Sequence, residues 1–414
     1  MSVFKENRSS NEYIALEDRY GAHNYHPLPV VLAKGEGVHV WDVEGRRYFD
    51  FLSAYSAVNQ GHCHPKIIGA LVEQAQTLTL TSRAFFNDKL GPYEKYVAEL
   101  FGYDKLLPMN TGAEAVETAI KICRKWAYEV KGITEESAQI IVCNGNFHGR
   151  TTTIISFSDD DNAKKHFGPY TAGFISIPYD DIAALESVLS SGSNIAGFLV
   201  EPIQGEAGVY VPQEGYLSEV RELCSKYNVL FIADEVQTGI ARTGKRLAVD
   251  HENVHPDILI LGKALSGGVY PVSAVLADNN IMNVIKPGQH GSTFGGNPIA
   301  AAVAVAALQV VEDEKLAENA MILGELFREK LNQYIANSTI VSLVRGKGLL
   351  NAIVINDTEE SETALNICLA LKEKGLLAKP THGNIIRFAP PLIITEDQLL
   401  ECTSIIIETL KAFE

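Results

Sequence analysis

Residues 230–268 read LFIADEVQTGIARTGKRLAVDHENVHPDILILGKALSGG, and they contain the clearest indications of the fold class. Two apolar runs, Val229 to Ala233 and Ile258 to Leu261, have the length and β-branched content of buried parallel strands. Each run delivers one ionisable residue at or just beyond its carboxyl end, Asp234 after the first and Lys263 after the second. Because ligands of open α/β sheets bind off the carboxyl ends of the strands, we expect an acid and an amine to meet there around a ligand.

Neither residue identifies a site when it is taken singly. Asp234 could cap a helix or lie at the surface, and lysine is rarely buried without a partner. Lys263 is preceded by Ile-Leu-Ile-Leu-Gly and followed by Ala-Leu-Ser-Gly-Gly. These flanks favour burial of the lysine. Burial disfavours the ammonium form and lowers the pKa, which suits a lysine that reacts with a carbonyl group.

The two motifs also carry a family resemblance. D-E-V-Q-T-G followed by L-G-K-A-L-S-G-G-x-Y-P resembles the core of the class-III, pyridoxal-phosphate-dependent aminotransferases that act on ω-amino groups. This resemblance implies fold-type I, an α/β architecture whose large domain has a mostly parallel seven-stranded sheet flanked by helices, with a smaller α+β domain. It also implies pyridoxal 5'-phosphate as the cofactor, and a homodimer or a larger oligomer.

Length and composition limit the other possibilities. A chain of 414 residues, 46% of them hydrophobic and 21% charged, has room for two domains with substantial cores. The formal net charge of −16 argues against nucleic acid as a partner. Six scattered cysteines form no disulfide framework and suggest a reducing compartment. His62-Cys63-His64 could suggest a metal, but a loop before Pro65 is the favoured interpretation, and we expect no metal site.

The expected organisation has three parts. Residues 1–49 form an N-terminal segment that contributes to the small domain, 50–311 the large cofactor-binding domain, and 312–414 the C-terminal small domain. The segment Met1 to Asn11 is polar and lacks the apolar core of a secretory signal. We therefore expect a cytoplasmic location, and a processed mitochondrial form remains an alternative. Pro298 to Val311 is too short to span a bilayer and is expected to be a buried helix, with no membrane partner.

A turn from Met109 to Glu114 has the pattern of an anion site. Thr111 and Glu114 have capping-box spacing, and a helical apolar stripe follows them. A helix N-terminus with glycine beside it presents free N–H groups to an anion, although an ordinary capped helix has the same pattern. The resemblance implies that Gly112 and Ala113 bind the cofactor phosphate.

The segment IIVCNGNFHGRTTTIIS is expected to form two β-rich runs around a polar turn. Phe147 could merely cover the edge of a core, and Arg150 could form an ordinary surface ion pair. The resemblance implies that Phe147 stacks on the pyridine ring and that Arg150 binds a substrate carboxylate, for which the planar guanidinium is suited. No role is assigned to His148.

The resemblance also implies specific roles for the residues at these strand ends and for several others. Asp234 and Lys263 are implied as the catalytic pair, and Gln237 as a hydrogen-bond partner of the cofactor's ring hydroxyl. Ser292 and Thr293 lie in a glycine-rich loop and would reach the cofactor of the neighbouring subunit. Strands are expected in VRGKGLLNAIVI and IIRFAPPLII, and the second run contains Arg387.

The substrate is the least constrained prediction. Glu206 and Arg387 match a pair that handles a carboxylate, Tyr25 matches a tyrosine at the α-carboxylate, and Tyr55 an aromatic wall for ornithine. These matches imply ornithine and 2-oxoglutarate as substrates, with acetylornithine or 4-aminobutyrate as alternative donors. A dehydrogenase would require the motif GxGxxG after an early strand, and the sequence lacks this motif. A non-catalytic binding protein would not need both Asp234 and Lys263.

Overall fold

A seven-stranded sheet forms the centre of the larger lobe. The computed structural model describes residues 8–414, so most of the polar leading segment lies outside the described residues. The strand order is β4-β10-β9-β8-β7-β5-β6, and β10 is antiparallel to both of its neighbours while the remaining pairs are parallel. The bounds are β4 Lys105–Met109, β5 Gln139–Cys143, β6 Phe174–Ile177, β7 Ile195–Val200, β8 Leu230–Asp234, β9 Ile258–Leu261 and β10 Ser273–Ala277. The predicted mostly parallel seven-stranded sheet is therefore confirmed.

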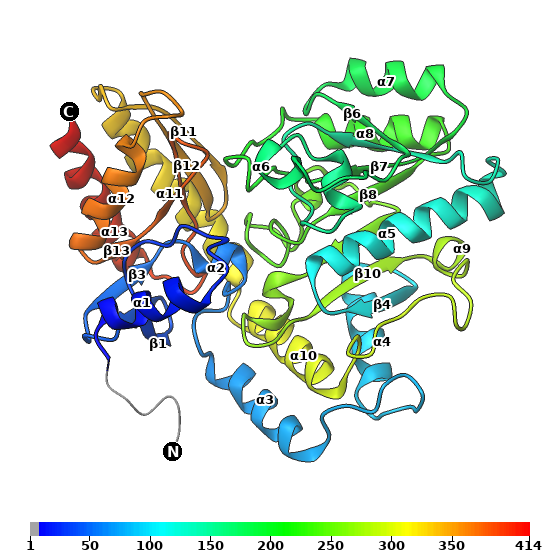
Figure 1. The fold of residues 1–414 in the computed structure, drawn as a ribbon, viewed down its shortest axis with the longest axis horizontal. Coiled ribbons are helices and arrows are strands. Elements are labelled where there is room, and N and C mark those ends of the chain that lie inside the picture. The colour runs from blue at the N-terminus through cyan, green and yellow to red at the C-terminus, as the bar shows by residue number, and fades with distance from the viewer. Residues whose placement is uncertain (1–7) are drawn as a thin grey trace.

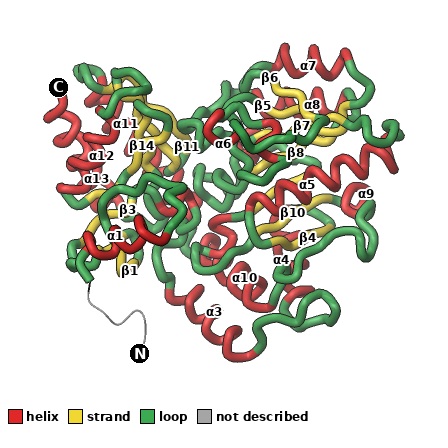
Figure 2. Tube along the Cα trace, in the orientation of Figure 1, coloured by secondary structure: helices red, strands yellow, loops and turns green. Residues whose placement is uncertain are grey.

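The central strands are buried on both faces, which explains their continuous apolar sequence. Alternate side chains enter two separate cores, so Phe231 packs in one and the next residue, Ile232, packs in the other. Figure 2 shows the strands gathered in this lobe with helices around them. These helices are α3 Pro65–Thr77, α4 Leu90–Phe101, α5 Gly112–Trp126, α6 Asp161–Lys164, α7 Ile182–Ser191, α8 Tyr216–Lys226, α9 Asn279–Met282 and α10 Pro298–Asp313. The expected buried helix at Pro298 is α10.

The second lobe combines the two ends of the chain (Figure 1). One four-stranded sheet has the order β1-β2-β3-β13 and the other β11-β12-β15-β14. Their strands are β1 Leu32–Glu36, β2 His39–Asp42, β3 Arg47–Asp50, β11 Val341–Lys347, β12 Leu350–Ile355, β13 Leu376–Leu377, β14 Lys379–Thr381 and β15 Ile385–Phe388. The helices are α1 Ser10–Tyr20, α2 Ser53–Ser56, α11 Leu316–Ile335, α12 Thr363–Glu373 and α13 Glu396–Leu410. The domain boundaries at residues 49 and 311 stay a prediction.

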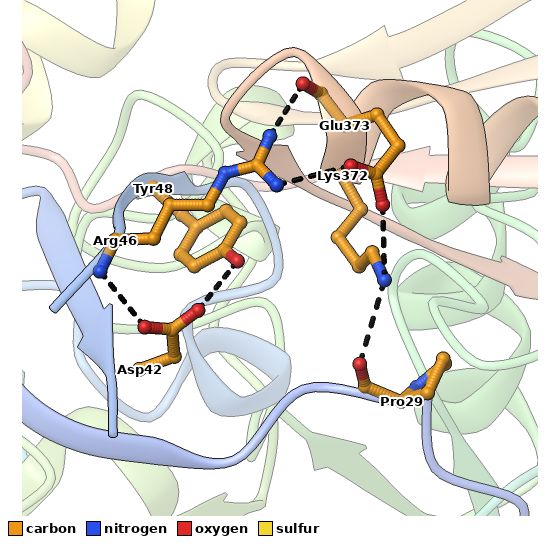
Figure 3. A network of polar contacts seen from close by, with 6 residues as sticks. All are labelled: Pro29, Asp42, Arg46, Tyr48, Lys372 and Glu373. Atoms are coloured by element: carbon orange, nitrogen blue, oxygen red, sulfur yellow. Dashed lines mark hydrogen bonds and ion pairs between the residues drawn. The ribbon is translucent and has the colours of Figure 1, made fainter. Parts of the chain in front are cut away.

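A polar network ties the N-terminal strands to α12 (Figure 3). Arg46 Nη1 donates to Glu373 Oε2 at 3.0 Å, and Lys372 Nζ donates to the carbonyl of Pro29 at 3.4 Å. The hydroxyl of Tyr48 donates to Asp42 Oδ2 at 2.7 Å. Burial and this hydrogen bond raise the pKa of Tyr48 to about 12, so the phenol stays a donor.

One expectation about local structure was wrong, and another was correct only for the first part of its run. The run after Arg150 is not a strand, because Ile154–Phe157 forms a 3-10 helix in which the N–H of Ile155 bonds to the carbonyl of Thr151 at 2.9 Å. The strand expected in IIRFAPPLII ends at Phe388, since Pro390 and Pro391 have no N–H to continue a ladder. Among residues 8–414, no helix is both long enough and apolar enough to cross a membrane.

A buried arginine joins the two lobes. Arg242, which is fully buried, follows the strand that carries Asp234. Its guanidinium donates two hydrogen bonds to Asn59 Oδ1 (2.6 and 3.1 Å) and one each to the carbonyls of Leu349 (2.9 Å) and Pro390 (2.7 Å). Burial lowers the pKa of Arg242 to about 9. The arginine thus connects the large sheet to the C-terminal part of the chain through neutral acceptors.

Arg242→Lys is expected to lower the free energy of unfolding by about 2–4 kcal/mol, because an ammonium cannot reproduce four hydrogen bonds from a planar fork. The measurement is the midpoint of urea denaturation. The matched control is Arg246→Lys in the same loop, whose partly exposed ion pair with Glu312 should contribute under about 1 kcal/mol. Equal shifts for the two variants would contradict the assigned role.

Candidate active site

A cavity of about 200 Å³ opens at the carboxyl ends of β8 and β9. Residues from five segments of the large lobe line it: Gly112, Ala113, Phe147, His148, Gly149, Glu201, Asp234, Val236, Gln237, Thr238 and Lys263. Asp234 and Lys263 therefore lie around one space, as expected for groups that end neighbouring parallel strands. The same cavity contains the predicted residues Gly112, Ala113, Phe147 and Gln237.

Lys263 has two unusual properties. It begins a short 3-10 helix, Lys263–Ser266, in a left-handed conformation with φ of 44°, which L-residues other than glycine rarely adopt. Burial, and then the charge of Arg387, lower the pKa of Lys263 to about 8. A substantial fraction of the amine is therefore neutral near pH 8, and a neutral amine is the nucleophilic form.

Asp234 is buried and held by two donors. The N–H of Val236 donates to Oδ1 at 3.0 Å, and His148 Nδ1 lies 2.6 Å from Oδ2. Burial alone would lower the pKa of His148, but the hydrogen bond and charge of Asp234 outweigh it and raise the pKa. Sequence reasoning assigned no role to this histidine, because only the fold brings residue 148 to the end of β8.

Glu201 is a second acid of the cavity that sequence reasoning did not assign. It accepts a hydrogen bond from the N–H of Phe147 at 2.9 Å, and burial raises its pKa to about 7. Its apolar strand β7 was a usable signal, because a carboxylate directly after a buried run must lie deep in the sheet edge. No cluster of three potential metal ligands occurs in residues 8–414. His62 and His64 instead pair with Asp50 and Glu314.

The N-terminus of α5 forms one wall of the cavity. Thr111 caps the helix, and Glu114 completes the predicted capping box. The cap uses the N–H groups of Thr111 and Glu114, so Gly112 and Ala113 contribute N–H groups without a partner in the described part of the chain. A Cβ on Gly112 would approach Val236 Cγ1 to 3.1 Å, which explains the glycine. A helix N-terminus with such N–H groups is suited to bind a phosphate.

Ser292 and Thr293 do not line this cavity. Ser292 Oγ accepts a hydrogen bond from Asn110 Nδ2 at 2.8 Å, just before the capped turn, and Thr293 is exposed. Their contact with a neighbouring subunit's cofactor stays a prediction.

Three predicted residues meet at one edge of the cavity. Arg387 is 2% exposed, and its Nη1 lies 3.1 Å from Glu206 Oε2, 3.1 Å from Gln237 Oε1 and 3.2 Å from the carbonyl oxygen of Gly205. Because arginine can only donate, the Gln237 atom that faces it must be the oxygen. The amide NH₂ of Gln237 then remains available to an acceptor in the cavity. A Cβ on Gly205 would collide with Gln237 Oε1 at 2.1 Å.

Tyr55 and Arg150 lie near the same edge, whereas Tyr25 lines neither this cavity nor the larger one that contains Arg150. The Arg387 guanidinium lies 4.7 Å from the centre of the Tyr55 ring, and the Arg150 guanidinium lies 5.7 Å from that of Phe147. Burial raises the pKa of Tyr55. Glu206 and Tyr25 raise this pKa further, whereas Arg387 and Arg150 lower it. Arg150 and Glu206 line a second, larger cavity of about 920 Å³. Tyr25 is 62% exposed on the N-terminal loop.

Comparisons with known proteins agree with this geometry. The model of the class-III aminotransferase family matches residues 20–410. The chain is 63% identical to the mitochondrial ornithine aminotransferase of Drosophila melanogaster, over 96% of this chain and 90% of the relative. A solved structure of ornithine aminotransferase from Toxoplasma gondii is 51% identical, with a TM-score of 0.96 over 98% of this chain and 95% of that one. An acetylornithine aminotransferase structure from Elizabethkingia anophelis is 66% identical, with a TM-score of 0.91 over 98% and 100%.

The chain therefore belongs to the class-III aminotransferases, and it is an enzyme with the fold-type I architecture. Its cofactor is pyridoxal 5'-phosphate, and the predictions of family, fold and cofactor are confirmed. The cavity fits this group, because it combines an amine of lowered pKa, a buried carboxylate and a helix N-terminus. Lys263, Asp234 and the turn at Gly112 are the residues that would hold its aldehyde, ring nitrogen and phosphate.

The lowered pKa of Lys263 predicts how apoprotein takes up the cofactor. Only the neutral amine attacks an aldehyde, so the rate of attachment should rise with pH and level off above about 8, instead of continuing to rise toward the usual pKa of lysine near 10.4. The measurement is the rate of cofactor absorbance change after mixing at constant salt. Arg387→Met removes a neighbouring positive charge and should move the midpoint upward. A rate that climbs steadily past pH 10 in the wild-type protein would contradict the lowered pKa.

Proposed function

We propose that the protein transfers the δ-amino group of L-ornithine to 2-oxoglutarate. The products are glutamate and glutamate 5-semialdehyde, which cyclises to pyrroline-5-carboxylate. The observation that carries this proposal is the ion pair of the buried Arg387 with Glu206 beside the cavity, with Arg150 nearby. The ornithine aminotransferases among the relatives, including one from Plasmodium falciparum that is 56% identical over the whole chain, support it.

Two carboxylate sites are needed because the two substrates bind in different directions. Ornithine presents its δ-amino group to Lys263 and carries its carboxylate at the far end, where Arg150 and Tyr25 are candidate partners. 2-Oxoglutarate places a carboxylate directly beside the reacting carbon, where Arg387 is the candidate partner. Bidentate contact with a planar guanidinium suits each carboxylate.

The chain's own groups supply the proton chemistry. Bound pyridoxal phosphate supplies an aldehyde that carries the amino group and an aromatic ring that accepts electrons. Asp234, oriented by His148 and the N–H of Val236, holds a proton on the ring nitrogen. Lys263 removes a proton from the carbon that bears the transferred amino group and returns one later, as general base and acid. Phe147 lines the same cavity, where its ring would stack on the pyridine ring of the cofactor.

The ion pair of Glu206 with Arg387 bears on which amine of ornithine is transferred. A free guanidinium beside the reacting carbon would also attract the α-carboxylate of ornithine and favour transfer of the wrong amine. We infer that Glu206 masks Arg387 while ornithine is bound and moves away for 2-oxoglutarate. The side chain of Glu206 is 29% exposed and that of Arg387 only 2%, so the carboxylate is the partner with room to move. Selectivity then comes partly from blocking the wrong pose.

Two further properties belong to the proposal. A homodimer is supported by exposed aromatic side chains, since Phe85, Phe86 and Phe294 are 74%, 106% and 50% exposed in the single chain. Phe294 follows the loop residues Ser292 and Thr293, so an interface there would bring them to a neighbour. Sedimentation equilibrium should give twice the chain mass. A cytoplasmic location is supported by the six cysteines, which are all free thiols.

A donor panel tests the proposed substrate. Ornithine, N-acetylornithine, 4-aminobutyrate and lysine are each supplied with 2-oxoglutarate, and glutamate formation is measured. Ornithine should give the highest kcat/KM. The identity to an acetylornithine aminotransferase makes N-acetylornithine the second candidate. A higher kcat/KM with N-acetylornithine or 4-aminobutyrate would replace ornithine as the donor.

Glu206→Ala should raise the rate with glutamate relative to that with ornithine by about 10- to 100-fold, because Arg387 is left open to the α-carboxylate. Stopped-flow absorbance of the cofactor gives the two half-reaction rates separately. Glu214→Ala, on the same loop and exposed, is the matched control and should leave the ratio unchanged. A wild-type ratio in Glu206→Ala would show that Glu206 masks nothing.

A further inference from the structure

Tyr55 lies on a backbone segment of unusual conformation. Four consecutive residues other than glycine, Ser53 to Ser56, have positive φ values of 49°, 47°, 60° and 72°. They form one left-handed helical turn, in which the N–H of Tyr55 bonds to the carbonyl of Leu52 at 2.9 Å. L-residues are disfavoured in this conformation because Cβ crowds the following carbonyl, so single residues adopt it far more often than a run of four. Such a turn persists only where its surroundings fix it.

Asp50 fixes the beginning of the turn. Its Oδ1 accepts hydrogen bonds from the N–H groups of Leu52 and Ser53, both at 2.9 Å. Its Oδ2 lies 2.7 Å from His62 Nε2. Asp50 itself ends β3 and is 8% exposed, so the carboxylate is held by a buried strand.

His62 is in turn anchored by the backbone. Its N–H donates to the carbonyl of Gly37 at 2.8 Å, and its carbonyl accepts from the N–H of Gly37 at 3.0 Å. Gly35 leaves room for the imidazole, since a Cβ there would lie 2.9 Å from the ring. His62 thus connects Asp50 to the hairpin formed by β1 and β2.

The other end of the turn is fixed by Asn59. Its backbone carbonyl accepts from the N–H of Leu392 at 2.8 Å, and its side chain bonds to Arg242 and to the carbonyl of Ile240. The turn is therefore held at both ends by buried groups. What it presents between them is the Tyr55 ring, 4.7 Å from the Arg387 guanidinium.

We propose that Asp50 and His62 are positioning residues for substrate selection, which hold the left-handed turn that places Tyr55 against Arg387. Loss of Asp50 lets the turn relax toward ordinary conformations, and Tyr55 leaves Arg387. The pocket then loses the wall that favours an extended ω-amino donor over an α-amino donor. The consequence for donor choice rests on the proposed function, whereas the position of Tyr55 does not.

The first test compares variants of Asp50. In Asp50→Ala, the ratio of half-reaction rates for ornithine over glutamate should fall about tenfold or more. Asp50→Asn keeps an oxygen that can accept from Leu52 and Ser53, so its ratio should fall less. His62→Gln, which leaves those two bonds intact, should change the ratio in the same direction by a smaller factor. Equal losses for both donors across these variants would overturn the proposal.

The second test is suppression of strain. Ala54 is exposed, and Ala54→Gly removes the Cβ that disfavours the turn without loss of packing. In the double variant Asp50→Ala/Ala54→Gly, part of the lost ornithine preference should return. Lys315→Gly is the matched control, since Lys315 is also left-handed and exposed but lies far along the chain at the start of α11. Recovery with Lys315→Gly, or none with Ala54→Gly, would contradict the role of the turn.

A crystal structure of Asp50→Ala without cofactor separates this proposal from the proposed function. The Tyr55 ring should be displaced from Arg387, whichever donor the enzyme prefers. If the ring stays near 4.7 Å from the guanidinium, Asp50 does not position it and the proposal fails. If the ring is displaced while the donor panel favours another amine, the positioning role stands and only the substrate changes.

Discussion

The fixed spacing of two neighbouring parallel strands sets the whole site. β8 ends at Asp234 and β9 ends just before Lys263, and the register pairs Asp234 with Ile260. The carboxylate and the amine are thus carried by buried strands that cannot shift without disrupting both cores. Every other group is placed relative to this pair, including the helix N-terminus at Gly112 and the histidine behind Asp234.

Electrostatics within the site depends on the same arrangement. Lys263 and Arg387 are two cationic groups near one cavity, and the second lowers the pKa of the first. Glu206 offsets the charge of Arg387 through a direct ion pair, while Asp234 is paired with His148. Moving Glu206 away from Arg387 would therefore also remove an anion that opposes the lowering of the pKa of Lys263. The proposed movement of Glu206 would therefore couple substrate selection to the reactivity of the amine.

Sequence reasoning gave the large sheet, its buried strands and the grouping of most predicted cofactor residues, because local patterns determine strands and the ends of parallel strands converge. It missed His148 and the raised pKa of Glu201, since both depend on burial against residues distant in the chain. It also gave no sign of the left-handed turn at Tyr55, because Ser-Ala-Tyr-Ser has no glycine to mark positive φ. The expected strand after Arg150 failed where a side chain and backbone from Thr151 started a 3-10 helix instead.

The site as a whole depends on Lys263 being the amine that holds the cofactor opposite Asp234. Borohydride reduction of the purified, cofactor-loaded protein, followed by peptide mass mapping, identifies the lysine that holds the cofactor. We expect the added pyridoxyl phosphate mass on the peptide that contains Lys263, and no such label in Lys263→Ala. A specific, stoichiometric label on any other lysine would contradict it.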